Sequence, residues 1–416
     1  MIFSLAPMEG ITGSVFRRVH AECFGALDRY YTPFLAPPQV GSSFGGKAYK
    51  EVDPERNQGL DVVPQLLTND ADKFVWATQV LADMGYAEVN LNLGCPSGTV
   101  VAKGRGAGFL RNLGELEGFL QEVCDRSRLP ISVKTRVGVL EDAEYEKILE
   151  LYCRFPLQEL IVHPRVQKDR YQGVPRLELY GETLRRAPFP VAYNGDIFGT
   201  DDMAALLEAY PETRHVMLGR GILSNPALAR MLNGGQAATA AELKHFHDKL
   251  FCAYEEEIGG NAVFRMKEWW SYAKYSFADP QVVHRAVRKA RKVGEYEEAV
   301  ERVFQTQGLS AEPRFGGVLG GCFLPGIPAT GPVRLPLSAR AGILVTPTSS
   351  GLEPLHGHHP HARARAEPQA YCRSGGHRPY RRGQHDSLHR ALPQGSHGRY
   401  GRRRASHPGR PPYLSA

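Results

Sequence analysis

The sequence predicts an α/β fold, in which a (β/α)8 TIM barrel precedes a small all-helical domain and a basic C-terminal tail. Short apolar, β-branched runs alternate with longer amphipathic stretches, which is the pattern of a parallel α/β protein. Eight such runs occur within roughly 220 residues, the number and length that a closed barrel needs. The turn after the first run reads APMEG and lacks the G-x-G-x-x-G pattern that a doubly wound nucleotide-binding sheet favours.

The expected strands follow one another at regular intervals. They cover residues 3–8, 29–34, 62–67, 87–93, 131–137, 159–164, 190–195 and 215–220. Amphipathic stretches separate them, and we expect helices over 70–85 and 112–127. In the first of these helices Asp70 can act as the cap and Gly85 can end the helix.

Strand patterns stop near residue 240. Four amphipathic stretches follow as far as residue 307, which predicts a small helical bundle. We therefore expect a catalytic barrel over residues 1–238, a helical domain over 239–308 and a tail over 309–416.

The tail differs in composition from the rest of the chain. Residues 311–416 contain fifteen arginines, no lysine and four acidic residues, a net charge of +11, whereas the preceding 310 residues carry −4. Because the tail is rich in Gly, Pro, Arg, His and Ser with little periodicity, we expect it to be disordered. The abrupt change favours a tail read from a shifted frame or a fused remnant, and a genuine basic RNA-binding tail is the alternative. An intact reading frame near codon 308, with weaker RNA binding after deletion of the tail, would exclude the remnant.

The composition argues against several classes of protein. No apolar run is long enough to span a bilayer, and the start MIFSLAPMEG has no secretory signal pattern. The seven cysteines form no C-x-x-C pair, so neither a disulfide framework nor a tetrahedral zinc site is expected. We expect a cytoplasmic protein with no membrane or metal partner.

Polar, chemically capable residues follow almost every predicted strand. In a (β/α)8 barrel the carboxyl ends of the strands form the active site. The residues at these positions are Pro7, Met8, Gln65, Asn90, Asn92, Cys95, Lys134, Arg136, His163, Arg165, Asn194, Asp196 and Arg220.

The turns after the last two strands predict a phosphate site. They read Asn194-Gly195-Asp196 and Gly219-Arg220-Gly221, and barrels of this kind often bind phosphate there. Glycine N–H groups can approach an anion, and an arginine can make a forked contact. Each glycine alone is explained as well by a tight turn; the two loops together favour phosphate.

Lys134 and His163 lie on neighbouring predicted strands and form a second pair. A reduced flavin carries negative charge near N1 and the C2 oxygen, which fixed positive charge stabilises. A lysine within a β-branched strand is costly to bury without an anionic partner. The alternative is an ion pair with a carboxylate of the barrel, and we favour the flavin.

Cys95 stands between Gly94 and Pro96, where a strand meets its loop. With an ordinary pKa of about 8.5 its thiol would be mainly protonated at neutral pH and could donate a proton. The sequence alone does not show whether Cys95 acts as a proton donor or as a nucleophile. The absence of a recognisable base with an orienting carboxylate disfavours a hydrolase.

Several segments together resemble the bacterial tRNA-dihydrouridine synthases. In order, they are APMEGITGSVFR, VPQLL, VNLNLGCPS, KGRGAGFL, SVKTRVG, LIVHPRVQKDRYQG, YNGD and VMLGRGILSNP. The resemblance covers residues 2–307, including the MKEWWSYAKY stretch of the helical domain. The GCP loop with its flanking motifs is a specific combination, although no single motif is.

The resemblance implies an FMN enzyme that uses NADPH to reduce the C5–C6 double bond of particular uridines in tRNA. It implies that Cys95 protonates C5 after N5 of the reduced flavin gives a hydride to C6. The residues implied to hold FMN are Pro7, Met8, Gln65, Lys134, His163, Asn194, Gly195, Asp196, Gly219 and Arg220. Asn92, Arg136 and Tyr171 would fix a uridine that has flipped out of its stack.

The chain departs from the family pattern in two places. His163 is followed by Pro164, Arg165 and Val166 rather than by Gly or Ala, Arg and Thr. Gly13 stands where an aspartate is common. Neither change touches the thiol or the phosphate loops, so they bear on loop geometry and tRNA selection.

The helical domain is expected to bind tRNA through its basic residues. These are Arg265, Lys267, Lys274, Arg285, Arg288, Lys289, Arg291 and Lys292. Backbone phosphates would supply much of the affinity. The interleaved Trp269, Trp270 and Tyr272 are better explained as core aromatics. We also expect Lys103 and Arg105 to contact RNA, because their loop follows Cys95 and borders the pocket.

Two other interpretations deserve comparison. An FMN barrel that reduces a small molecule, such as a dihydropyrimidine or an enone, would not need a basic helical domain. A catalytically silent RNA-binding relative would not need Cys95, Lys134 and His163, and a yellow colour of the purified protein would exclude it. The uridine position is not fixed by the sequence, although the MEG of the first motif hints at position 16. We expect a monomer.

Overall fold

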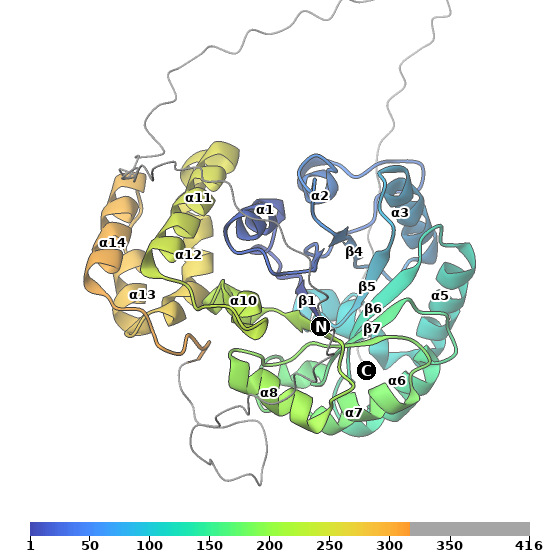
Figure 1. Ribbon diagram of the computed structural model, residues 1–416. Coiled ribbons are helices and arrows are strands. Elements are labelled where there is room, and N and C mark those ends of the chain that lie inside the picture. The colour runs from blue at the N-terminus through green and yellow to red at the C-terminus, as the bar shows by residue number, and fades with distance from the viewer. Residues whose placement is uncertain (317–416) are drawn as a thin grey trace, which may run out of the picture. The chain divides into compact units, whose positions relative to one another are not determined.

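The computed structural model describes residues 1–316 (Figure 1). Nine parallel strands form one sheet in the order β3-β2-β1-β9-β8-β7-β6-β5-β4. The strands are β1 (Ile2–Leu5), β2 (Arg29–Tyr31), β3 (Val62–Val63), β4 (Gln65–Leu66), β5 (Val89–Leu93), β6 (Ile131–Arg136), β7 (Glu159–His163), β8 (Val191–Tyr193) and β9 (His215–Leu218).

The two edges of this sheet are halves of one predicted strand. Pro64, which separates β3 from β4, has no backbone N–H and interrupts the ladder. Because β3 pairs with β2 while β4 pairs with β5, the divided strand joins both edges and closes the barrel. The predicted barrel and its eight strands are confirmed, with the third strand in two pieces.

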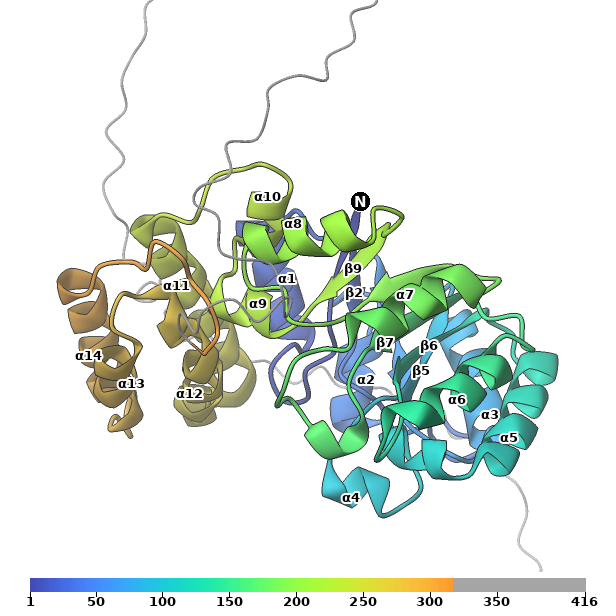
Figure 2. The same cartoon turned by 90° about the horizontal axis from the view of Figure 1, so that it is seen from below.

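Helices surround the strands (Figures 1 and 2). They are α1 (Ser14–Cys23), α2 (Gly46–Val52), α3 (Ala71–Asp83), α4 (Gly98–Val101), α5 (Leu113–Arg126), α6 (Tyr145–Tyr152), α7 (Leu177–Arg186), α8 (Thr200–Ala209), α9 (Arg220–Ser224) and α10 (Leu228–Leu232). The two helices predicted in detail are α3 and α5. Asp70 caps α3 by accepting from the Lys73 N–H at 3.0 Å, as predicted.

The four predicted C-terminal helices are confirmed as α11 (Ala240–Ile258), α12 (Ala262–Ala273), α13 (Pro280–Arg288) and α14 (Val293–Thr306). Trp269 and Trp270 are 2% and 1% exposed, so they are core residues, as expected. Phe246 of α11 packs edge-on against Phe16 of α1 and against Phe24, which directly follows α1. Residues 1–316 thus belong to one unit, and a domain boundary at 238 stays a prediction.

Gly13, one of the two departures from the family pattern, is explained by its neighbour Glu51. A Cβ on Gly13 would lie 2.8 Å from Glu51 Oε1. The Glu51 carboxylate, which comes from α2, accepts from the Ser14 N–H and from Arg17 Nη1, both at 2.9 Å. A carboxylate from another helix therefore caps α1 in place of a local aspartate.

The first residues of the predicted tail are part of the fold, so the expected disorder does not hold for them. Leu309 forms an isolated antiparallel bridge with Phe277. Arg314 forms an ion pair with Asp202 at 3.0 Å and another with Asp201. The acidic residues at the start of α8 hold this segment. The rest of the predicted tail, from residue 317, lies outside the described residues.

Candidate active site

A cavity of about 620 Å³ lies at the carboxyl ends of the strands. It collects most of the predicted site residues, from β1, β5, β6, β7, β8 and β9 or from the loops that follow them. They are Pro7, Met8, Asn92, Cys95, Lys134, Arg136, His163, Tyr171, Asn194, Gly195, Gly219 and Arg220. Parallel strands bring these distant positions to one end of the barrel. We call this space the catalytic cavity.

Cys95 stands in the loop directly after β5 and faces the catalytic cavity. Its backbone N–H donates to Asn92 Oδ1 at 2.9 Å, and its carbonyl accepts from the Ala107 N–H at 3.1 Å. Gly106 makes this packing possible, because a Cβ there would lie 2.9 Å from the Cys95 oxygen. Burial raises the pKa of the Cys95 thiol, so the thiol is protonated at neutral pH.

Basic side chains dominate the charge of the catalytic cavity. The four that line it are Lys134, Arg136, Arg170 and Arg220. Among residues 1–316, only Arg220 of these four has an ion pair, at 2.5 Å from Asp196. Burial, with Arg136 nearby, lowers the pKa of Lys134 to about 7. Burial also lowers the pKa of Arg136 to about 10.

His163 lies among these cations and is buried. Burial, followed by the charges of Arg136 and Lys134, holds the pKa of His163 well below its usual range. Its Nε2 lies 3.2 Å from Nη1 of Arg165. A neutral imidazole beside several cations can accept or donate a hydrogen bond but adds no further positive charge.

Gln65, predicted to bind the cofactor, does not line the catalytic cavity. It is fully buried and bonds to two asparagines of β5. Its Nε2 donates to Asn90 Oδ1 at 2.8 Å, and its Oε1 accepts from Asn92 Nδ2 at 2.7 Å. The observed role of Gln65 is to hold Asn92, which does line the cavity.

Asp196, also predicted to bind the cofactor, does not line the catalytic cavity and is bonded to two arginines. Its carboxylate accepts from both Nη atoms of Arg165, at 2.9 and 2.5 Å, and from Arg220. One carboxylate shared by two guanidinium groups leaves a net positive charge beside the glycine turns. Asn194, in the same loop, donates to the Met217 carbonyl at 2.8 Å and so ties β8 to β9.

Arg136 and Tyr171, predicted to fix the uridine, are in contact with each other. The Arg136 guanidinium donates to the carbonyls of Gly94 and Val166, both at 2.9 Å, and lies 5.4 Å from the Tyr171 ring centroid. Arg136 therefore organises the loops around the cavity. Tyr171 is 48% exposed, so its ring is accessible to a ligand.

Lys103 and Arg105, predicted to contact RNA, do not line the catalytic cavity. Lys103 is exposed, and Arg105 Nε donates to Asn69 Oδ1 at 3.1 Å. They lie in the loop after α4, and α4 separates them from Cys95 in the sequence.

Tyr272 and Phe315 line the catalytic cavity without having been predicted there. Their rings stack at 5.3 Å with an interplanar angle of 26°. Phe315 also lies 5.2 Å from the Arg220 guanidinium. Tyr272 packs against the core, as expected, but it also lines the cavity, and no pattern in the sequence marks Phe315.

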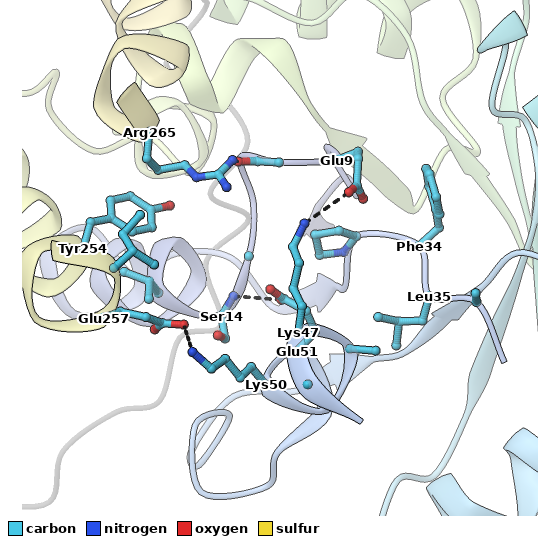
Figure 3. A pocket seen from close by; sticks show the side chains of 18 residues that line it. Glu9, Ser14, Phe34, Leu35, Lys47, Lys50, Glu51, Tyr254, Glu257 and Arg265 are labelled. Atoms are coloured by element: carbon cyan, nitrogen blue, oxygen red, sulfur yellow. Dashed lines mark hydrogen bonds and ion pairs between the residues drawn. The ribbon is translucent and has the colours of Figure 1, made fainter. Parts of the chain in front are cut away.

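A second cavity, of about 520 Å³, adjoins the first and shares Glu9 and Phe34 with it (Figure 3). Its basic side chains are paired: Lys50 with Glu257 at 3.1 Å and Lys47 with Glu9 at 3.5 Å. Arg265, on α12, pairs with Glu268 at 2.7 Å. We call this space the paired cavity.

The catalytic cavity therefore suits an anionic ligand, and it places a protonated thiol beside that ligand. Lys134 has no anionic partner among residues 1–316, which fits a flavin whose reduced ring is negatively charged. Within the described residues, no group of three His, Cys, Asp or Glu side chains could hold a metal ion. In the same part of the chain, no helix is long and apolar enough to cross a membrane. The fold and the cavity define a (β/α)8 barrel with a cationic ligand site at the carboxyl ends of its strands.

The chain belongs to the dihydrouridine synthase family, because the model of the family described as "Dihydrouridine synthase (Dus)" matches residues 4–307. The predicted family and reaction class are thereby confirmed. The match ends before Phe315.

Individual relatives support this assignment. The tRNA-dihydrouridine(16) synthase of Cupriavidus necator is 27% identical over 325 residues, 71% of this chain and 95% of the relative. A probable tRNA-dihydrouridine synthase 1 of Synechocystis is 26% identical, over 73% of this chain and 86% of the relative. A probable tRNA-dihydrouridine synthase of Staphylococcus aureus is 29% identical, over 61% and 79%.

Proposed function

We propose that this chain uses NADPH and FMN to reduce the C5–C6 double bond of particular uridines in tRNA to 5,6-dihydrouridine. The observation that carries the proposal is the Cys95 thiol, whose pKa is raised by burial, in a cavity where Lys134, Arg136 and Arg170 have no ion pair among residues 1–316. FMN, when bound, supplies the hydride for C6. The relatives named as tRNA-dihydrouridine synthases support tRNA as the substrate.

The residues that would hold FMN are those that line the cavity at the ends of β6 to β9. Lys134 and His163 would contact the negatively charged side of the reduced ring. Gly195, Gly219 and Arg220 would hold the phosphate, with Arg220 making charged hydrogen bonds. A Cβ on Gly195 would lie 2.0 Å from the Tyr193 hydroxyl, so this turn requires glycine.

Cys95 would protonate C5 of the uridine. A proton donor must keep its proton until the substrate arrives, and the raised pKa of the buried Cys95 thiol meets this requirement. Asn92, which lines the cavity, holds the turn that presents the thiol. Tyr171, exposed beside Arg136 and Arg220, would stack against the flipped base.

The helical bundle offers a surface for the tRNA backbone. Five exposed basic residues of the bundle that have no ion pair among residues 1–316 lie close together in the sequence: Arg285, Arg288, Lys289, Arg291 and Lys292. They lie on α13 and in the turn to α14. Phosphate contacts of this kind would make tRNA binding salt-sensitive. We propose a monomeric, cytoplasmic enzyme, with Lys103 and Arg105 as further RNA contacts.

NADPH-dependent formation of dihydrouridine in unmodified bulk tRNA tests the proposal, with Cys95→Ala and Cys124→Ala compared. Cys124 is a matched control: burial raises the pKa of its thiol to about 11, but it lies on α5 away from the cavity. Wild type and Cys124→Ala should modify tRNA, and Cys95→Ala should keep flavin but lose about 100-fold or more in turnover. NADPH oxidation by wild type without dihydrouridine would instead indicate a small-molecule reductase.

A further inference from the structure

A series of buried side chains, joined by hydrogen bonds, runs along β5 from its amino-terminal end to the loop that carries Cys95. Its members, from the amino-terminal end of the strands to the carboxyl end, are Glu88, Ser132, Asn90, Gln65 and Asn92. Their exposed fractions lie between 0% and 7%. We call it the polar line.

The upper part of the polar line consists of three amides. The Cys95 N–H donates to Asn92 Oδ1 at 2.9 Å, and Asn92 Nδ2 donates to Gln65 Oε1 at 2.7 Å. Gln65 Nε2 then donates to Asn90 Oδ1 at 2.8 Å. Each amide accepts with its oxygen on the Cys95 side and donates with its nitrogen away from it. Turning any one amide over would break two hydrogen bonds.

The lower part of the polar line ends on a carboxylate. Asn90 Nδ2 donates to Ser132 Oγ at 2.9 Å, and Ser132 Oγ donates to Glu88 Oε1 at 2.5 Å. Arg29 Nη1 donates to Glu88 Oε2 at 2.9 Å, an ion pair that offsets part of the cost of burying the carboxylate.

The two ends of the polar line allow only one direction of donation. A backbone N–H, at Cys95, only donates, and at Glu88 the carboxylate accepts from Ser132 and Arg29, both of which oppose the rise in its pKa that burial causes. Hydrogen bonds that all point the same way polarise and strengthen one another. The charge on Glu88 therefore helps to fix the amide of Asn92, although Glu88 does not line the catalytic cavity.

We infer that Glu88 and Ser132 are positioning residues for uridine reduction. Through the polar line they hold the Asn92 oxygen on the Cys95 backbone, and so they fix where the Cys95 thiol stands. They also hold the Asn92 nitrogen away from Cys95, on Gln65 Oε1. This inference rests on the proposed role of Cys95 as the proton donor.

A second buried network gives a matched control. Ser4 Oγ lies 2.6 Å from His215 Nε2, and His215 Nδ1 lies 2.6 Å from Glu159 Oε1. Ser4, like Ser132, is a fully buried strand serine at 0% exposure. None of the three residues lines the catalytic cavity. Ser4→Ala therefore removes a similar hydroxyl from a network that has no hydrogen bond to the polar line among residues 1–316, although Glu159 lies beside Ser132 and adds to the rise that burial causes in the pKa of Glu88.

The test compares Ser132→Ala, Glu88→Gln and Ser4→Ala in the flavin-loaded full chain. Turnover on tRNA, KM for tRNA and the rate of Cys95 alkylation by iodoacetamide, followed on the Cys95 peptide by mass spectrometry, are measured for each. Ser132→Ala and Glu88→Gln should lower kcat by about tenfold with little change in KM, because loss of orientation at a reacting group slows turnover more than it weakens binding. Ser132→Thr, which keeps the hydroxyl, should recover most of kcat.

Alkylation distinguishes a failure of this inference from a failure of the proposed function. A loosened turn exposes the Cys95 thiol, so Ser132→Ala and Glu88→Gln should be alkylated about fivefold faster than wild type and Ser4→Ala. Equal kcat and equal alkylation in Ser132→Ala, Glu88→Gln and Ser4→Ala would overturn the inference. If wild type forms no dihydrouridine, the proposed function is wrong. The alkylation rates alone then show whether the polar line fixes the position of Cys95. Glu88→Gln keeps the test decisive if Ser132→Ala does not fold.

Discussion

The catalytic cavity and the paired cavity have similar volumes, about 620 and 520 Å³, and share Glu9 and Phe34, yet their charges are arranged differently. In the paired cavity, Lys47 and Lys50 each have a carboxylate partner. In the catalytic cavity, Lys134 has no such partner among residues 1–316. Charged residues in a cavity therefore do not by themselves mark a ligand site. A buried cation without an anionic partner does mark a ligand site, because its burial is costly unless a bound anion balances its charge.

The largest change in flavin affinity is expected for Arg220, which lies in the second of the predicted phosphate turns. Arg220→Met should weaken FMN binding by about 30-fold, since a hydrogen bond to a charged group contributes about 2 kcal/mol. Riboflavin, which lacks the phosphate, should bind both proteins almost equally. Fluorescence titration of the flavin-free proteins measures both affinities, and an equal loss for the two ligands would argue against a phosphate contact.

Glu51, which lines the paired cavity, is expected to matter for stability instead. Glu51→Gln should lower the free energy of unfolding by about 3 kcal/mol, because it leaves the buried Arg17 guanidinium without its charged partner. Glu9→Gln, which removes only the exposed pair with Lys47, should cost less than about 1 kcal/mol. Urea unfolding measures both, and FMN affinity should remain as in wild type for Glu51→Gln. A large loss of flavin there would remove the distinction between the two cavities.

Lys134 should give the flavin-free protein a distinctive pH dependence. Its pKa falls from 10.5 to about 7 on folding, so between these values the unfolded chain holds a proton that the folded chain lacks. Stability therefore rises with pH in this window, by about 2 kcal/mol between pH 7.5 and 9. Lys134→Met should lack this contribution. Parallel pH curves for the two proteins would show that Lys134 is not held at a depressed pKa.

The smallest effect is expected for Phe315, whose ring lies against the Arg220 guanidinium. Phe315 comes after the part of the chain that matches the family. Phe315→Ala should weaken FMN binding by about threefold, the size of an exposed cation–π contact. Leu309→Ala, in the same segment but away from the cavity, is the control. If both variants bind FMN equally well, the ring has no role in holding Arg220.

The sequence was sufficient for the architecture, because strand and helix periods repeat over many residues. It also located the cavity, since the polar residue after each strand must lie at the same end of a parallel barrel. Cys95, Lys134 and Arg220 follow directly from that rule. The strands and helices could be predicted from the local sequence pattern. The position of the site could be predicted because parallel strands bring their carboxyl ends together.

Side-chain partners could not be predicted in the same way. Gln65 and Asp196 stand at strand ends, yet they bond to Asn92 and to two arginines rather than lining the cavity. Position along a strand does not tell which neighbour a side chain meets across the barrel. Tyr272 and Phe315 reach the cavity from outside the barrel, so no strand pattern could indicate them.

Replacement of one lysine in each cavity tests the central claim most directly. FMN affinity is measured by fluorescence titration for Lys134→Met and for Lys50→Met, whose wild-type lysine pairs with Glu257. Lys134→Met should bind FMN about tenfold more weakly than wild type, whereas Lys50→Met should bind it as wild type does. Equal affinities in the two variants would contradict the claim that unbalanced charge marks the flavin site.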